Sequence, residues 1–216
     1  MNPTGHGRED SLVMNSTNGE SELAGILDES EEFDIFFNII NRFIGHYTRK
    51  TQRRTINDTD TEYPFVAMDT RQVFAQLKFV RNYLDEKGGK PPGHGYSFLD
   101  IGCGIGNILL FAEQFGFDAH GIEKDLYPRE TASSLLDTDQ IYDEDIRNFE
   151  RYGDFDILYY FCPLTDGQRE FERHIEESLR PGGVLIANYK RDNGIRQDRR
   201  FLRLHNALPI WEKLHA

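Results

Sequence analysis

Hydrophobic positions follow two different periods along the chain, and the change between them falls near residue 95. Before it, apolar side chains recur every three or four residues, the period of a helix with one buried face. This pattern predicts one helix over Glu31–Tyr47 and a second over Asp69–Lys87, with Asp69 as the N-cap of the second. After residue 95, short apolar runs alternate with helical segments.

The alternation predicts parallel strands with helices on both faces of the sheet. The expected strands are Ser97–Ile101, Ala119–Glu123, Gln140–Tyr142, Asp156–Phe161 and Gly183–Tyr189. The expected helices between them are Asn107–Phe115, Tyr127–Leu136 and Asp166–Leu179. Arg200–His205 and Pro209–Leu214 form either two final strands or a closing hairpin. We therefore expect an α/β fold, a Rossmann-like three-layer sandwich with a mostly parallel sheet, preceded by a helical N-terminal cap.

Composition divides the chain into three parts. Residues 1–30 are rich in Gly, Ser, Asn and acidic side chains, which predicts a disordered acidic tail. Glycines and prolines gather between Gly88 and Gly95. We take this break as the boundary between a helical cap over residues 31–95 and a core over residues 96–216.

The formal net charge of −12 and the pI of about 5.0 disfavour nucleic acid as a partner, because phosphates would be repelled. The two cysteines are too few for a disulfide framework, which favours a cytoplasmic protein. No apolar run approaches the ~20 residues that span a membrane, so no membrane association is expected. The histidines form no HExxH pattern, and no metal is expected. The sequence leaves the oligomeric state open.

A glycine-rich turn follows the first core strand. The strand Phe98–Ile101 ends in Gly102-x-Gly104-x-Gly106, where glycines let the backbone turn sharply and approach a ligand closely. The next helix begins near Asn107, so its first N–H groups face the same place. Glu123 closes the next strand about 20 residues later, where a carboxylate can accept hydrogen bonds from ribose hydroxyls. The order of these features predicts a nucleotide-like cofactor.

The glycine spacing discriminates between cofactors. In the dinucleotide fingerprint the third glycine comes three residues after the second, whereas here Gly106 comes two after Gly104. Asp100 precedes the first glycine by two residues, and its carboxylate suits an ammonium better than a pyrophosphate. No Gly-Lys-Ser/Thr phosphate loop is present. A nicotinamide oxidoreductase and an ATPase or GTPase are therefore disfavoured.

The run Phe98–Asn107 resembles motif I of the class I S-adenosylmethionine (SAM)-dependent methyltransferases. Gly121–Glu123, Asp143–Ile146, Asp154–Tyr160 and Leu179–Leu185 are similar to the later elements of that family, in the same order. The resemblance covers about Ser97 to Tyr189. It implies a seven-stranded sheet and SAM as the methyl donor, but no particular substrate, since a fold does not fix a function.

The resemblance also implies which residues hold the cofactor. The glycine loop would line the methionine and ribose part, and Asp100 would orient the loop and the amino group. Glu123 would bind the ribose, and the segment around Asp145 would hold the adenine, with Asp143 and Glu144 as alternative acids. The expected cofactor-binding residues are Asp100, Gly102, Cys103, Gly104, Gly106, Asn107, Glu123, Lys124, Asp145, Ile146 and Phe161.

Methyl transfer from a sulfonium needs positioning and exclusion of water more than an acid–base pair, and the sequence indicates no catalytic residue. The segment Tyr159–Leu164 lacks the Asn/Asp/Ser-Pro-Pro-aromatic pattern of methyltransferases that act on the amino groups of bases. Cys162-Pro163 reverses the Pro-Cys order of cytosine-C5 enzymes. We expect methyl transfer to a small molecule or a protein side chain. The alternative is a non-catalytic SAM-binding or interaction partner of another enzyme.

Three further features bear on the acceptor. The basic clusters at residues 49–54 and 190–203 are either solvated or bind an anionic substrate or an acidic protein. Tyr63–Val66, the second helix and the ending Leu208–Trp211 are similar in layout to small protein-lysine methyltransferases. The two N-terminal helices are expected to pack beside the carboxyl ends of the strands and to form part of the acceptor pocket, because ligands bind at that edge.

Overall fold

The structure is a computed structural model, and it describes residues 29–88, 90, 95–136 and 139–215. The chain divides into two compact units, Met1–Ile39 and Ile40–Ala216. The α-helices are α2 (Glu29–Gln52), α3 (Thr70–Lys87), α4 (Asn107–Gln114), α5 (Leu126–Leu136) and α6 (Gln168–Ser178). The strands are β1 (Ser97–Ile101), β2 (Asp118–Ile122), β3 (Ile141–Tyr142), β4 (Ile157–Phe161), β5 (Val184–Asn188), β6 (Phe201–Arg203) and β7 (Ile210–Lys213).

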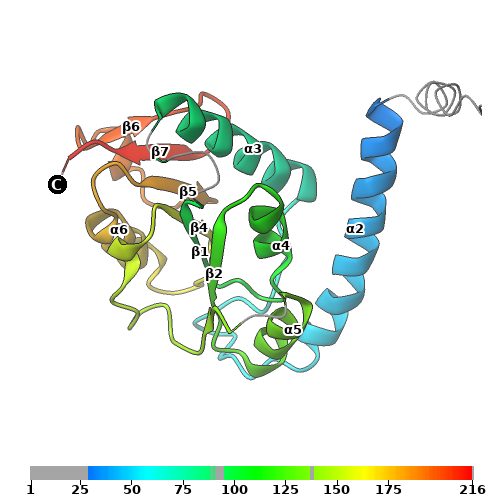
Figure 1. The fold of residues 1–216 in the computed structure, drawn as a ribbon. Helices are drawn as coiled ribbons and strands as arrows, with labels where there is room; N and C mark the ends of the chain where they lie inside the picture. The colour runs from blue at the N-terminus through cyan, green and yellow to red at the C-terminus, as the bar shows by residue number, and fades with distance from the viewer. Residues whose placement is uncertain (1–28, 89, 91–94, 137–138, 216) are drawn as a thin grey trace, which may run out of the picture. The chain divides into compact units, whose positions relative to one another are not determined.

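Within the described residues, seven strands form one sheet in the order β3-β2-β1-β4-β5-β7-β6 (Figure 1). The first five strands in that order are parallel, and β7 runs antiparallel to both β5 and β6. The central strand β1 places Asp100 opposite Gly121 of β2 on one side and Tyr159 of β4 on the other. The mostly parallel sheet predicted from the sequence is confirmed, and the C-terminal segments form an antiparallel pair of strands.

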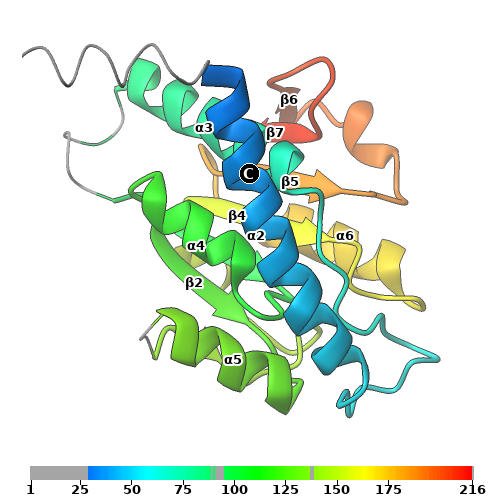
Figure 2. The ribbon, with the colours of Figure 1, turned by 90° about the vertical axis from the view of Figure 1, so that its right-hand side faces the viewer.

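The strands are buried on both faces, which explains why they read as continuous apolar runs. One face packs side chains such as Phe98, Tyr159 and Ile186 into a hydrophobic core with α3, α4 and α5. The opposite face packs Leu158 and Leu185 with α6. Figure 2 shows the helices α4 and α6 on opposite sides of the sheet. The three-layer sandwich is therefore confirmed.

Helix α3 begins and ends as its sequence predicts. The Asp69 carboxylate accepts a hydrogen bond from the Gln72 N–H at 2.9 Å, and Gly88 follows the helix with a φ of +68°. Leu77 and Val80 are fully buried in the core on the sheet. This helix is therefore a covering layer of the sheet.

Helix α2 extends beyond the expected Glu31–Tyr47 at both ends. Its last turn is held by the fully buried Thr51, whose hydroxyl donates to the Tyr47 carbonyl oxygen at 2.9 Å. The tail expected over residues 1–30 lies outside the described residues, apart from its last two. No described helix is long and apolar enough to cross a membrane.

Candidate functional site

A cavity of about 490 Å³ opens at the carboxyl ends of β1, β2 and β4. Its wall combines Gly102 after β1, Glu123 after β2 and Cys162 after β4 with the segment 57–68 that precedes α3. Parallel α/β sheets bind ligands at this edge, and volumes of about 300–1,000 Å³ are usual for small-molecule sites. The cavity is thus placed and sized for a small-molecule ligand.

The glycine turn is held firmly against β2. The N–H groups of Gly102 and Cys103 both donate to the Ile122 carbonyl oxygen, at 3.0 and 2.9 Å. Gly104 has a φ of +56°, and a Cβ added there would overlap the ring of Phe65. Both the dihedral angle and the close aromatic ring therefore require glycine at this position.

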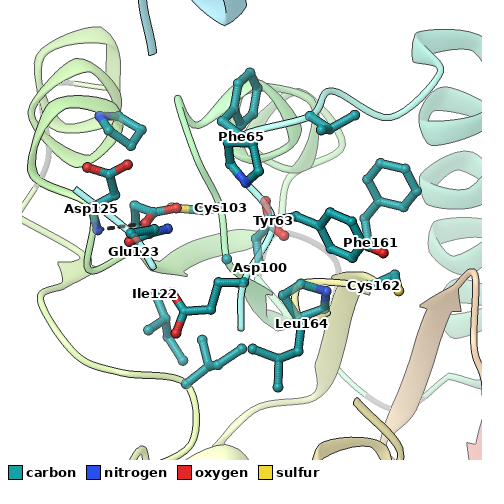
Figure 3. A pocket seen from close by; sticks show the side chains of 18 of the residues that line it. Tyr63, Phe65, Asp100, Cys103, Ile122, Glu123, Asp125, Phe161, Cys162 and Leu164 are labelled. Carbon is teal, nitrogen blue, oxygen red and sulfur yellow. Dashed lines mark hydrogen bonds between the residues drawn. The ribbon is translucent and has the colours of Figure 1, made fainter. Parts of the chain in front are cut away.

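Glu123 lies almost fully buried at one end of the cavity, with Asp125 beside it (Figure 3). Its two carboxylate oxygens accept the N–H of Gly104 at 3.0 Å and the N–H of Asp125 at 2.8 Å. Burial outweighs these hydrogen bonds and raises the pKa of Glu123 to about 7. The glycine turn is thus hydrogen-bonded directly to Glu123, the acid that follows β2.

Three acceptor atoms in this wall are buried without a hydrogen-bond partner among the described residues: Asp100 Oδ2, Asn107 Oδ1 and Asp125 Oδ2. Burial, followed by the nearby charge of Glu123, raises the pKa of Asp100 well above its usual value. An unsatisfied buried polar group costs about 1–3 kcal/mol, and native proteins retain few of them. We call the part of the cavity that is lined by the side chains of Asp100, Asn107 and Asp125 the acidic end.

A charged cluster lies in the wall beside β3. The carboxylate of Glu62, only 5% exposed, contacts the Lys124 ammonium and, at 2.6 Å, the guanidinium of Arg147. Asp145 accepts from Lys124 at 3.0 Å and from the Arg147 N–H at 2.9 Å. Burial acts to raise the pKa of Asp145, but these donors lower it below its usual value. Asp145 is therefore held as a carboxylate, and the cluster ties the segment before α3 to the core.

Aromatic side chains line the other end of the cavity, which we call the aromatic end. Phe161 and Cys162 lie away from Glu123 and Asp125 in Figure 3. The rings of Phe161 and Tyr189 contact each other with their centroids 5.3 Å apart. Cys162 and Tyr189 have positive φ angles of 36° and 53°, a strained backbone that clusters at functional sites.

Three observations limit the chemistry of the aromatic end. Burial raises the pKa of the Cys162 thiol despite the nearby Arg191, so the thiol is protonated near neutral pH. No described histidine lines the cavity. Among the residues that the structure describes, no three His, Cys, Asp or Glu side chains are grouped to hold a metal ion.

Nine of the eleven expected cofactor-binding residues line this cavity; Gly104 and Gly106 do not. The ring of Phe65 covers the α-carbon of Gly104. The α-carbon of Gly106 faces α5, where a Cβ would lie 3.1 Å from the side chains of Ala132 and Leu136. These two glycines shape the turn, and their α-carbons do not form the cavity wall.

Sequence reasoning missed the segment 57–68 of the wall, and also Asp125 and Tyr189. This segment is fixed to the chain after β4 by hydrogen bonds from Tyr63 N–H to the Pro163 carbonyl oxygen, at 3.2 Å, and from Thr165 N–H to the Thr61 carbonyl oxygen, at 3.1 Å. The available signal was a short apolar run, Tyr63–Met68, between two helices.

The expectation that the helices themselves form part of the pocket needs correction. No described residue of α3, and none of residues 40–52 in α2, lines the cavity. Helix α3 packs against the sheet, and its apolar side chains are buried there. The segment between α2 and α3 lines the cavity in their place.

No protein-family model and no curated protein matches the sequence. Solved structures match its fold. DesVI of Streptomyces venezuelae is 21% identical with a TM-score of 0.41, covering 55% of this chain and 51% of that one. The plantazolicin methyltransferase BpumL, in complex with a desmethyl analogue and SAH, is 22% identical with a TM-score of 0.46, covering 55% and 47%. The magnesium protoporphyrin IX methyltransferase of Synechocystis, with bound SAM, is 14% identical with a TM-score of 0.47, covering 71% and 88%.

The match spans about half the length of the first two of these proteins. The fold assignment rests on the chain's own sheet. The seven strands of the described residues, mostly parallel, form the fold that the resemblance to class I methyltransferases implied.

Proposed function

We propose that this chain binds SAM in the cavity and transfers the methyl group to an acceptor that enters at the aromatic end. The observation that carries the proposal is the set of three buried, unpaired acceptor atoms at the acidic end. SAM offers matching donors, namely an ammonium group and two ribose hydroxyls. Each new hydrogen bond would remove the penalty of an unsatisfied buried group.

Different residues of the cavity would bind different parts of SAM. Asp100 would accept the ammonium, and Glu123 with Asp125 would accept the ribose hydroxyls, since both side chains line the same end of the cavity and the Glu123 carboxylate accepts the Asp125 N–H at 2.8 Å. Asp145 and Ile146 would hold the adenine, with Lys124 beside them. Charge-assisted hydrogen bonds of this kind are about twice as strong as neutral ones.

When bound, SAM supplies a methyl group already activated on a sulfonium. The chain's own residues then orient the acceptor and exclude water. No histidine of the described residues lines the aromatic end, and Cys162 is protonated, so neither residue type is set to remove a proton there. The acceptor atom would therefore have to be nucleophilic without losing a proton to a residue of the aromatic end.

Calorimetry with SAM, S-adenosylhomocysteine (SAH) and NAD tests the proposal. We expect SAM and SAH to bind with micromolar-range affinity and NAD to bind at least about a hundredfold more weakly, because a pyrophosphate would meet the acidic end. Tighter binding of NAD would favour a dinucleotide enzyme. Binding of SAH without methyl transfer to any acceptor would favour a non-catalytic SAM-binding protein.

A further inference from the structure

A second cavity adjoins the first, and arginines dominate its wall. It is lined by Arg169, Arg173, Arg191, Asp192, Asn193, Gly194 and Gln197. Arg191 also lines the cofactor cavity, on the side of Phe161 and Tyr189. The arginine groove, as we call the second cavity, therefore lies beside the aromatic end, with Arg191 in the wall of both.

Two of the three arginines in this groove have no carboxylate partner among the described residues. The Arg191 guanidinium donates to the Tyr63 hydroxyl at 2.9 Å and to the Thr165 carbonyl oxygen at 3.2 Å. Arg169 forms no ion pair within the described part of the chain, although the pKa of Asp192 is lowered by the Gly194 N–H and, less strongly, by the charges of Lys190, Arg173 and Arg169. Arg173 pairs with Glu170 at 3.0 Å and with Asp192 at 3.7 Å. On a chain of net charge −12, unpaired neighbouring arginines indicate a site for an anion.

The turn that carries Arg191 is held by hydrogen bonds to Glu172, whose side chain is fully buried. Its carboxylate accepts the N–H groups of Arg191, at 2.8 Å, and Asp192, at 2.6 Å. It also accepts from the side chains of Gln168, at 2.9 Å, and Lys190, at 3.1 Å. Four donor groups therefore hold this turn, and the arginine is presented by a rigid backbone.

The aromatic side chains beside Arg191 indicate the shape of the group that would bind there. Tyr189 is 71% exposed, yet it keeps a positive φ of 53° and contacts the ring of Phe161. A large aromatic side chain held exposed in a strained conformation at a cavity mouth is typical of a ligand clamp. A planar group fits against such rings.

We propose that the methyl acceptor is a planar anionic small molecule, whose planar reacting group packs against Phe161 and Tyr189 and whose carboxylate or phosphate binds Arg191 and Arg169. The inference rests on the proposed function, because it assigns the acceptor of the same site. It disfavours a lysine side chain as the acceptor, since its ammonium would meet the two unpaired guanidinium groups.

The test is a calorimetric titration of the full-length, SAH-saturated protein with benzoate, phenyl phosphate and the neutral benzamide. We expect one of the two anions to bind at least about tenfold more tightly than benzamide, the value of one charge-assisted hydrogen bond. Whichever anion binds more tightly identifies a carboxylate or a phosphate. Equal binding of the anions and benzamide, or no binding of either anion, overturns the proposal.

Arginine variants locate the site. Arg191→Gln and Arg169→Gln should each lower the affinity for the anionic probe by about tenfold. Arg199 is exposed and lies outside both cavities, so Arg199→Gln should leave this affinity unchanged. Arg169→Gln removes no ion pair of the described chain, so we expect its unfolding free energy to match that of the wild type, and urea denaturation checks this. Unchanged affinity in both groove variants overturns the proposal. SAH is titrated separately into each protein, so a failure of SAH binding shows instead that the proposed function is wrong.

Discussion

Glu123 is a carboxyl group that the fold keeps from water while two backbone N–H groups point at it. Sequence reasoning located this acid from its distance to the glycine turn. It could not reveal that the carboxylate already binds the turn, because that contact depends on the register of β1 and β2. The same holds for Phe65, whose ring covers Gly104 although the two are far apart in the sequence.

The pKa of about 7 for Glu123 predicts how cofactor affinity depends on pH. A ribose hydroxyl that donates to the carboxylate favours its ionised form, so the bound protein has the lower pKa and holds fewer protons. SAH affinity should therefore rise with pH up to about 7 and level off above it. Burial raises the pKa of Asp100 as well, which acts in the same direction.

Calorimetry between about pH 5.5 and about pH 8 checks this dependence. Glu123→Gln should bind SAH more weakly and with a shallower slope against pH, because its amide does not titrate. A wild-type affinity that falls as the pH rises toward 7, or an unchanged slope in the variant, would contradict the role of Glu123.

Gly104→Val should abolish SAH binding. Valine is strained at a φ of +56°, and its Cβ would displace the Phe65 ring from the turn. Gly116→Val is the matched control, since Gly116 also has a positive φ of 74° but only the end of Arg81 nearby. We expect similar backbone strain in both variants, about 1–3 kcal/mol by chemical denaturation, but normal SAH affinity in Gly116→Val. A folded Gly104→Val that binds SAH normally would defeat this account of the turn.

At the scale of elements, the strands and α3 were predictable because their signals are local. Continuous apolar runs mark strands buried on both faces, and Asp69 marks the start of α3. The role of the segment 57–68 was not predictable, since its partners lie about a hundred residues away: the Thr165 hydroxyl donates to the Asp60 carbonyl oxygen across 105 positions. Such contacts leave no period in the sequence.

Two variants near this segment should separate its anchoring from the stability of the helix it precedes. Glu62→Gln removes the buried charge between Lys124 and Arg147, so the segment should loosen and SAH affinity should fall by several-fold. Asp69→Ala removes only the cap of α3 and should cost about 1 kcal/mol of unfolding free energy. Calorimetry and urea denaturation of both variants provide the check. Weaker SAH binding in Asp69→Ala alone would contradict the assignment.

At the scale of the second unit, residues 40–216, the two ends of the cavity carry opposite chemistry. Carboxylates gather at the acidic end, and unpaired arginines follow the aromatic end. The sequence indicated Asp100 and Glu123 through the glycine turn and Arg191 through a basic cluster, but it did not indicate Arg169. The separation of the two groups across one cavity depends on the sheet order, which places β5 two strands away from β1. This separation suits a cation-bearing cofactor at one end and an anionic acceptor at the other.

Asp100→Asn, measured by calorimetry with SAH, tests the central claim most directly. The claim is that the unpaired acceptors of the acidic end are a SAM site. Loss of the charge that faces the ammonium should weaken the binding of SAH by about 1.5–3 kcal/mol, which lowers its affinity roughly tenfold to a hundredfold. Asp85→Asn, which alters only an exposed carboxylate paired with Arg81 on α3, should leave the affinity unchanged. Equal affinity of the wild type and Asp100→Asn would contradict the claim.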